Sequence, residues 1–429
     1  MAKYTHSVAI DPEKCTGCTT CLRRCPVEAI RIRDEKAVIN ANQCIDCGEC
    51  IRVCKHNAKH ASYDKLSDLD FSKYLIALPA PSLFGQFNHL DEADFVIQGL
   101  LDMGFSDVYE VAKAAEYVTD LTRIYMAGEN VARPVISSAC PVVVRLIKLR
   151  FPTLCDQLVP ILPPYELAGK LARERALEEH PELKPEDIKT VFISPCPAKV
   201  SWAKSVMEGQ TVYVDYVTSM NDVYMTLLDK MKGSVPGPDS APEAGSVGLR
   251  WATTSGEAAS LMNEGYLTAD GIDNVIKVLD DLESGMLGDI GFVELNACSP
   301  GCVGGVLAPS NGYVARLRLQ SLQKTVVVKP NNLEDIESLE RFKGEIPSDY
   351  TEAEAFTYMP DGAPNMFKMM LAMKKAEALA EKLPNKDCGA CGSPTCRAYA
   401  EDVVRGVAGK DRSCVVLDRK DKNGEAGTE

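Results

Sequence analysis

The first 60 residues contain eight cysteines in two runs of equal spacing, and no other feature of the sequence constrains the fold as strongly. In each run the cysteines are separated by two, two and three residues; the runs are Cys15, Cys18, Cys21, Cys25 and Cys44, Cys47, Cys50, Cys54. The chain has 17 cysteines among 429 residues, too many to be explained by packing. Because a reducing cytosol disfavours disulfides, thiolate ligation of metal is the better explanation.

The doubled run is typical of bacterial proteins with two 4Fe–4S clusters, in which the fourth cysteine of each run binds the other cluster. A zinc ribbon would leave the doubling unexplained. The sequence therefore predicts a ferredoxin-like domain at residues 1–65 with two clusters. Their ligand sets are Cys15, Cys18, Cys21 and Cys54 for one cluster, and Cys44, Cys47, Cys50 and Cys25 for the other.

A third group of four cysteines lies near the end of the chain, at Cys388, Cys391, Cys396 and Cys414. The stretch CGACGSPTCRAYAEDVVRG resembles a small 4Fe–4S domain that is appended to several anaerobic redox proteins. Zinc is a competitor on spacing alone, but the company of other clusters favours iron. We expect a C-terminal 4Fe–4S domain at 361–429, which begins with an amphipathic helix at about 365–382.

Between these ends, apolar strands alternate with amphipathic helices, which predicts a largely parallel sheet covered by helices. The expected strands are 74–79, 133–137, 189–194 and 289–295, and the expected helices are 91–105, 112–129 and 164–180. A Gly/Pro/Ser-rich stretch at 232–246 predicts an exposed loop between two lobes. The fold class is therefore α/β over 66–360, with smaller α+β domains at both ends.

Charge and hydropathy narrow the functional classes. The formal net charge of −14 argues against nucleic acid as a partner. Residues 1–60 carry +3 and the remainder −17, so a mildly basic patch could dock an acidic electron carrier, or could be ordinary solvated surface. No stretch reaches the length needed to span a bilayer, and the N-terminus lacks signal-peptide features. We expect a cytoplasmic protein without a membrane partner.

Four of the remaining five cysteines follow predicted strands in three loops: Cys140, Cys196, Cys298 and Cys302. Open α/β sheets place their sites at strand ends, so we expect these thiols to meet in a cleft between the lobes. The fifth, Cys155, has an apolar context that predicts a buried residue without a ligand role.

These three loops resemble the signature motifs of FeFe (iron-only) hydrogenases, and the resemblance extends over nearly the whole chain. It implies a two-lobed catalytic domain that holds the H-cluster, a 4Fe–4S cube joined to a diiron subsite with CO, cyanide and azadithiolate. By position, Cys140, Cys196 and Cys298 would hold the cube, and Cys302 would bridge the cube and the diiron subsite.

The resemblance implies further roles around the diiron subsite. Lys199 matches a lysine that interacts with a cyanide ligand, and a buried ammonium needs such an anionic partner. Ala80, Pro81 and Ser82 match the segment that lines the other face. The glycines near Cys302 (Gly301, Gly304 and Gly305) would let the backbone approach a bulky cofactor.

Several positions depart from the active members of the family. A proton-relay cysteine is replaced by Ala139, which can neither donate nor accept a proton, and an acidic residue of the path falls near Met126. Two methionines that pack the diiron subsite become Ser194 and Asn296, and a glutamine becomes Tyr165. Missing relays reduce rate without abolishing binding, since proton transfer contributes ~10²–10⁴-fold.

This combination resembles the sensory branch of the family, in its group without a PAS domain. We expect a sensory or regulatory hydrogenase of low turnover, with electrons passing through three accessory 4Fe–4S clusters. One alternative is an electron-coupled hydrogenase of the ferredoxin type with a different proton path. Another is a hydrogenase-like assembly or carrier protein without the diiron subsite. Expected partners are dihydrogen and protons, a redox carrier such as ferredoxin or a signalling protein, and maturation proteins.

Overall fold

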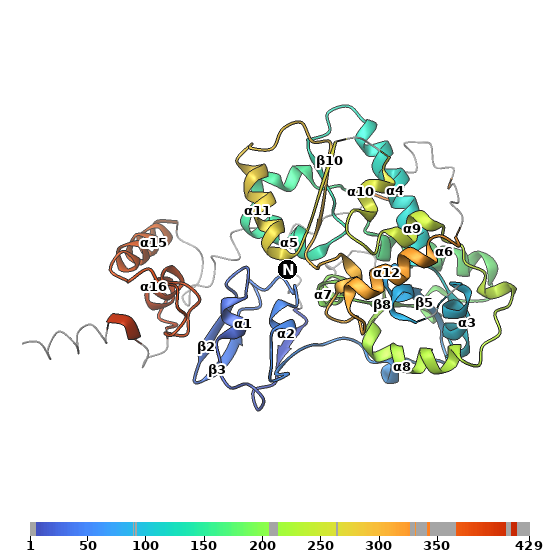
Figure 1. Ribbon diagram of the computed structural model, residues 1–429, viewed down its shortest axis with the longest axis horizontal. Helices are drawn as coiled ribbons and strands as arrows, with labels where there is room; N and C mark the ends of the chain where they lie inside the picture. The colour runs from blue at the N-terminus through green and yellow to red at the C-terminus, as the bar shows by residue number, and fades with distance from the viewer. Residues whose placement is uncertain are drawn as a thin grey trace, which may run out of the picture. The chain divides into compact units, whose positions relative to one another are not determined.

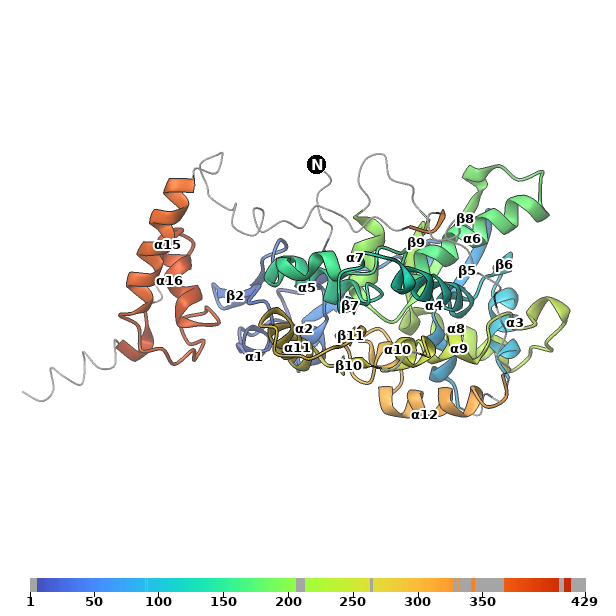
Figure 2. The same cartoon turned by 90° about the horizontal axis from the view of Figure 1, so that it is seen from above.

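The computed structural model describes residues 6–88, 90, 92–205, 213–262, 265–326, 331, 341–343, 366–408 and 413–417. Figures 1 and 2 show it in two orientations. The chain forms two compact units: Met1–Ser7 with Ser62–Tyr350, and Val8–Ala61 with Thr351–Glu429. Among the residues described, no helix has both the length and the apolar composition needed to cross a bilayer.

The first unit contains a parallel four-stranded sheet in the order β6-β5-β8-β9. Its strands are β5 (Tyr74–Pro79), β6 (Asp107–Val108), β8 (Ile188–Ser194) and β9 (Tyr216–Ser219). Continuous apolar runs such as LIAL are buried on both faces, as a helix-covered parallel sheet requires. The helices that pack beside it are α3 (Asp94–Asp102), α6 (Pro164–Glu179) and α8 (Met220–Met231).

The same unit has a second parallel sheet, in the order β10-β11-β7. These strands are β7 (Val135–Ile136), β10 (Tyr266–Asp270) and β11 (Phe292–Asn296), with α10 (Gly256–Ser260) and α11 (Ile272–Glu283) packed against them. Further helices among the described residues of this unit are α4 (Val111–Ala127), α5 (Pro141–Arg150), α7 (Pro197–Lys204), α9 (Ser246–Arg250) and α12 (Gly312–Leu322). The parallel α/β organisation predicted from the sequence is therefore confirmed.

The stretch 232–246 differs from its prediction as an exposed loop. Its second half is tied down by two carboxylates of the α4 region, and Ser240 and Ala244 are fully buried. Glu110 Oε2 accepts hydrogen bonds from the amides of Glu243 (2.6 Å) and Ala244 (3.1 Å). The prediction therefore agrees with residues 232–239, which are exposed or half-buried, but not with the second half, because a composition rich in Gly, Pro and Ser shows turn formation but not the acceptors that lie opposite.

The second unit begins with two similar halves that are offset by 29 residues, Cys15 corresponding to Cys44. The helices α1 (Thr20–Arg23) and α2 (Glu49–Arg52) correspond, and the antiparallel pairs are β1 (Val8–Ile10) with β4 (Lys59–Ala61) and β2 (Ile30–Arg33) with β3 (Lys36–Ile39). The halves exchange matching hydrogen bonds: the Asp11 amide donates to the Ala58 carbonyl and the Asn40 amide to the Ala29 carbonyl, both at 2.8 Å.

The C-terminal part of this unit contains α15 (Met366–Ala380) and α16 (Cys396–Val404), as expected for a helix followed by a Cys-rich module. It joins the first part through the Ile32 amide, which donates to the Gly392 carbonyl at 2.8 Å. The carboxylate of buried Asp402 accepts from Arg31 Nε (2.6 Å), Arg33 Nη2 (2.7 Å) and Ser393 Oγ (2.7 Å). Residues far apart in sequence are thus fixed around one carboxylate.

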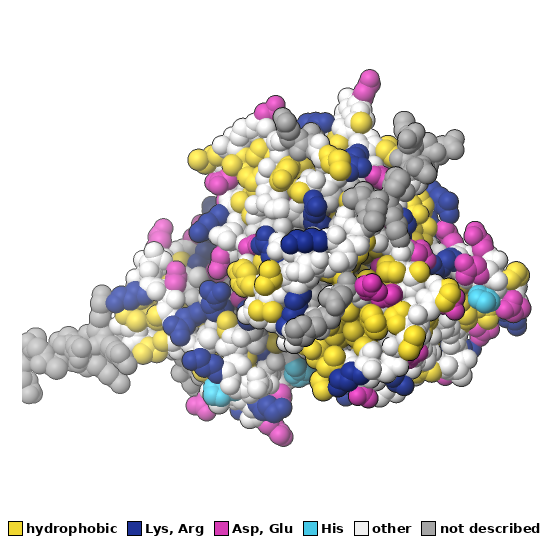
Figure 3. All heavy atoms as spheres, turned by 45° about the vertical axis from the view of Figure 1, so that its right-hand side comes forward, with side chains coloured by type: hydrophobic (Ala, Val, Ile, Leu, Met, Phe, Trp, Pro, Cys, Tyr) yellow, Lys and Arg dark blue, Asp and Glu magenta, His cyan; other side chains and the backbone are white. Residues whose placement is uncertain are grey.

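Surface charge is mixed. On the face drawn in Figure 3, basic and acidic side chains both occur among hydrophobic ones. Neither sign of charge forms a continuous surface over the whole of that view.

Candidate functional site

Three strand ends of the first unit bring four cysteines together. Cys140 follows β7 and is the N-cap of α5, and Cys196 follows β8 and is the N-cap of α7. In both helices proline occupies the first position, where the missing amide proton is not needed. Cys298 follows β11, and Cys302 begins the short turn η6 (Cys302–Gly304). The chain therefore presents thiols at strand C-termini, as predicted.

Lys199 lies among these four thiols. Its Nζ is 3.9 Å from Cys302 Sγ, and its other charge partners are Cys196, Cys140 and Cys298. Burial disfavours the ammonium, but the four thiolates outweigh that effect and raise the pKa of Lys199 above its usual value. The rings of Tyr165 and Phe192 lie 5.8 and 5.9 Å from Nζ. The half-buried Lys199 side chain thus lies among cysteine sulfurs that would be anionic when they bind metal.

The thiols themselves are poorly suited to remain free. Burial raises the pKa of Cys140, and raises that of Cys196 to about 12 although Lys199 acts against it. A metal ligates the thiolate and displaces the proton, so half-buried thiols that face one ammonium are suited to metal. The donor set fits a thiolate-bound iron–sulfur cluster.

A cavity of about 50 Å³ is lined by two of the four cysteines, Cys140 and Cys302, whereas a single water needs roughly 10–15 Å³. Nine of the residues singled out from the sequence line it: Ala80, Pro81, Ser82, Ala139, Cys140, Tyr165, Lys199, Asn296 and Cys302. Cys196, Cys298, Ser194 and Met126 are not among its lining residues. The cavity is therefore placed where the diiron subsite was expected, and Ala139 contributes to its wall.

The two polar replacements differ in position. Ser194 is fully buried, and its Oγ accepts from the Cys196 amide (3.1 Å) and donates to the Cys196 carbonyl (3.0 Å). Asn296 lines the cavity, and its Nδ2 donates to Glu294 Oε1 at 2.7 Å. Ser194 therefore shapes the backbone of a cysteine loop, while Asn296 orients a carboxylate.

The glycines near Cys302 act differently from the expectation. A Cβ at Gly305 would overlap the carbonyl oxygen of Pro195, and Gly301, at φ +95°, lies close to the backbone of Thr253 and Thr254. These glycines therefore let protein loops approach one another, and they are absent from the cavity lining. The close approach was predicted correctly, but its partner is backbone.

Sequence reasoning missed two buried glutamates that line the cavity, Glu257 of α10 and Glu294 of β11. Burial and the neighbouring carboxyl group raise the pKa of Glu257, which accepts from Ser137 Oγ at 2.6 Å. Burial also raises the pKa of Glu294, whose oxygens accept from the amides of Ser255 (3.0 Å) and Ala258 (2.8 Å). The sequence signal that could have revealed Glu294 is its position inside the otherwise apolar strand FVEL.

The second unit gathers its cysteines as their spacing predicts. Cys25, Cys44, Cys47 and Cys50 line one small cavity, and Cys388, Cys391, Cys396 and Cys414 line another. Cys21 interacts electrostatically with Cys18 and Cys15. Amides point at sulfur in both halves: Ala29 N donates to Cys25 Sγ (3.2 Å) and Ala58 N to Cys54 Sγ (3.3 Å).

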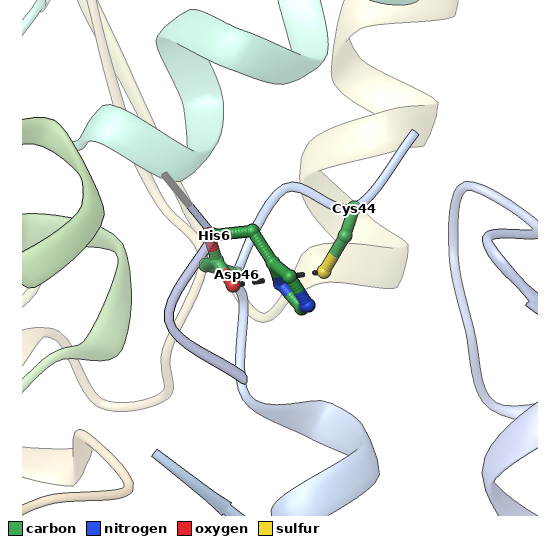
Figure 4. A group of neighbouring side chains, drawn as sticks. All are labelled: His6, Cys44 and Asp46. Carbon is green, nitrogen blue, oxygen red and sulfur yellow. Dashed lines mark hydrogen bonds between the residues drawn. The ribbon is translucent and has the colours of Figure 1, made fainter. Parts of the chain in front are cut away.

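Two more cysteine surroundings are informative. Figure 4 shows Cys44 beside Asp46, with Sγ 3.6 Å from Oδ1. Cys155 lies in the turn η3 (Pro152–Gln157) and is partly exposed, so the prediction that it is buried was wrong. The turn brings its side chain to the edge of the fold, which an apolar context alone could not reveal.

Comparison with known proteins agrees with this organisation. Residues 73–236 match the family model of the iron-only hydrogenase large subunit, C-terminal domain; residues 7–55 match a 4Fe–4S dicluster domain, and residues 383–416 an Fe–S cluster family. No curated protein matches the chain.

Solved structures of FeFe hydrogenases are similar to the chain at low identity. The HydA(deltaEFG) structure, from work on stepwise H-cluster assembly, is 16% identical, with 71% of this chain and 94% of that chain covered and a TM-score of 0.44. A glutamate-to-alanine variant of HydA1 from Chlamydomonas reinhardtii is 15% identical, with the same coverages and TM-score.

These features define an iron–sulfur protein with dicluster and C-terminal cluster domains. More particularly, the resemblance to the iron-only hydrogenase family is confirmed over residues 73–236, so the chain is an iron–sulfur protein with a region similar to FeFe hydrogenases. The described residues fit the family's H-cluster: Cys140, Cys196, Cys298 and Cys302 would hold it, and Lys199 would face its anionic ligands.

Proposed function

We propose that this protein binds dihydrogen as a sensory or regulatory FeFe hydrogenase of low turnover, in the cytoplasm. Electrons would pass through three accessory 4Fe–4S clusters to a redox carrier or a signalling protein, and maturation proteins would supply the diiron subsite. The observation that carries the low turnover is Ala139, which contributes a methyl group to the cavity wall where active hydrogenases need a proton-relaying thiol.

The chain's own residues perform three tasks in this proposal. The four cysteines fix the cofactor at the strand ends, and Lys199 supplies a buried positive charge directed at the cavity. The apolar wall, from Ala80 and Pro81 to Phe192, excludes water from the site. When bound, the H-cluster supplies the metal chemistry that splits or forms dihydrogen.

Proton handling is the weakest part of the site. Ala139 cannot accept a proton, and the carboxyl groups of the cavity wall are those of buried Glu257 and Glu294. Their raised pKa values favour the neutral acid form, so the pair can retain a proton without an added charge. Proton exchange through buried groups that favour one protonation state is slow. Slow proton exchange fits a protein that regulates by binding dihydrogen and turns it over slowly.

The test is infrared spectroscopy and turnover of the matured protein. We expect CO and cyanide bands that change between argon and dihydrogen, with a turnover far below that of active hydrogenases. Matured Cys302→Ala protein is the matched control and should lack the bands. Turnover comparable to active hydrogenases would contradict the sensory proposal, and absence of the bands would contradict the diiron subsite.

One observation favours a second candidate, an electron-coupled hydrogenase with a different proton path. Ser137, Glu257, Glu294 and Asn296 form a nearly continuous polar group at the cavity. In that case Glu257→Gln would reduce an initially high turnover. A low turnover in the wild-type protein favours the sensory role.

A further inference from the structure

The two halves of the ferredoxin-like part differ in charge at two corresponding positions. With the 29-residue offset, Ile30 of the first half corresponds to Lys59 of the second, and Gly17 corresponds to Asp46. Ile30 and Lys59 each follow the alanine whose amide donates to a cysteine sulfur. One half is therefore apolar and uncharged at both positions, while the other half carries one charge of each sign.

Lys59 is an unusual buried cation. Its side chain is 4% exposed, and its ammonium nitrogen has no hydrogen-bond partner within the described part of the chain. Its electrostatic effect reaches both expected ligand sets, through Cys21 of one and Cys50 of the other. Burial raises the pKa of both thiols, and Lys59 is the largest charge acting in the opposite direction. An unpaired buried ammonium needs negative charge beside it, and thiolate-bound clusters supply that charge.

Asp46 lies against the second ligand set. It is fully buried, its Oδ1 accepts from the Val8 amide at 3.1 Å, and Cys44 Sγ lies 3.6 Å away. After burial, its charge is the largest cause that raises the pKa of Cys44, and it also acts on Cys50. Asp46 has a φ of +50°, close to the +66° of Gly17, so the same turn carries a carboxylate in one half only.

The other nearby cations do not cancel this difference. Arg31 acts on Cys25 of the second set, but its guanidinium is ion-paired with Asp402 at 2.6 Å. Lys36 Nζ donates to the carbonyl of Cys15 at 2.7 Å, which adds positive charge on the side of the first set. The first set therefore faces net positive charge, and the second set faces charges that offset one another.

We propose that Asp46 separates the reduction potentials of the two ferredoxin-type clusters and that Lys59 shifts both potentials together. The shared Lys59 ammonium raises the potentials of both clusters, because each becomes more negative when it gains an electron. The Asp46 carboxylate lowers the potential of the cluster held by Cys25, Cys44, Cys47 and Cys50. A single electron added to the pair resides on the cluster held by Cys15, Cys18, Cys21 and Cys54.

The test is a redox titration of the full-length reconstituted protein followed by electron paramagnetic resonance. It is performed at about pH 8, where histidines are neutral. Each signal is assigned with Cys18→Ser or Cys47→Ser, which removes a ligand of one cluster. In Lys59→Ile, which installs the residue of the first half, both clusters should become harder to reduce. The equilibrium constants should fall at least about tenfold, about 59 mV for one electron.

Three variants complete the design. Lys59→Arg keeps the charge and should retain the wild-type potentials, while Lys55→Met removes an exposed charge and should shift them much less. Asp46→Asn keeps an acceptor for the Val8 amide and should raise only the potential of the Cys44 cluster. Equal potentials in the wild-type protein, or unchanged potentials in Lys59→Ile, would overturn the proposal. If Lys59→Ile loses its clusters, the Asp46→Asn variant becomes the test. An unchanged separation between the two cluster potentials in that variant also overturns the proposal.

Discussion

The cavity site of the first unit and the cysteine sites of the second unit both offer cysteine thiols as ligands, but they are built differently. In the second unit, short loops place most ligands within a few residues of one another, and neighbouring amides point at sulfur. In the first unit, Cys140, Cys196 and Cys298 follow three strands of two sheets. The cysteine sites of the second unit therefore depend on local spacing in the sequence, whereas the cavity site of the first unit depends on the whole fold.

The difference also concerns the surroundings of the thiols. The cavity site adds a buried ammonium, two buried carboxyls and an apolar wall to its cysteines. Such surroundings tune chemistry at a bound group. The comparison therefore predicts that changes at the cavity affect turnover, while changes in the second unit affect electron supply and local stability.

The largest effect is expected for Cys302→Ala. Turnover of matured protein should fall to background because the thiol nearest Lys199 is lost. Iron bound by the second unit should be retained, as measured by iron analysis. Cys155→Ala is the matched control, since Cys155 does not line the cavity, and it should leave turnover unchanged. Retained carbonyl bands in Cys302→Ala would show that the cavity does not depend on this thiol.

The next effect is expected for Glu257→Gln, which keeps the shape of the side chain but cannot exchange a proton. Turnover should fall about 10²-fold, the lower end of the usual contribution of proton transfer. Hydrogen–deuterium exchange in dihydrogen gas measures this step. Glu116→Gln is a matched control: burial also raises the pKa of Glu116, which lies outside the lining. An equal loss in both variants would indicate a structural cause.

Disruption of the Asp402 cluster should affect the second unit alone. Asp402→Ala leaves Arg31 and Arg33 without their shared carboxylate. The free energy of unfolding of this unit should fall by about 2 kcal/mol, less than is usual for a buried ion pair because both arginines are partly exposed. Amide exchange across 388–404 should accelerate ten- to a hundredfold, while turnover with an artificial electron donor stays constant. Glu401→Ala, which removes exposed pairs with Arg397 and Arg405, should change exchange little.

A smaller effect concerns pH. The pKa values of Glu257 and Glu294 are raised, so the folded state binds more protons than the unfolded state above the usual glutamate value. Stability should therefore fall as pH rises from about 5 to about 8. Over this pH range, Tm should decrease by about 3 °C less in Glu257→Gln than in the wild-type protein. An identical decrease would show that the carboxyl is already ionised.

The smallest effect is expected for Ala139→Cys. The new thiol would reach the cavity wall, but the second relay position, Met126, is not among the lining residues. Turnover should rise less than about tenfold, well below the full contribution of a relay. An increase to the rates of active hydrogenases would show that a single missing group limits the reaction.

The cysteine ligand sets and the parallel sheets could be predicted because spacing and apolar runs encode them locally. Glu257 could not, because it reaches the cavity only through the packing of α10 against β11. The role of Gly305 was misjudged for the same reason: its close neighbour, Pro195, lies 110 positions away in the sequence. Contacts between distant loops are decided by the fold.

The hydrogen bond from Ile32 to Gly392 has a consequence for protein synthesis. Its two residues are 360 positions apart, so the N-terminal cysteine runs leave the ribosome long before their C-terminal neighbour exists. At translation rates of 5–20 residues per second the interval is roughly 20–70 s. During that interval Arg31 and Arg33 lack their carboxylate, so the contacts that join the two parts of this unit form only after nearly the whole chain has been made.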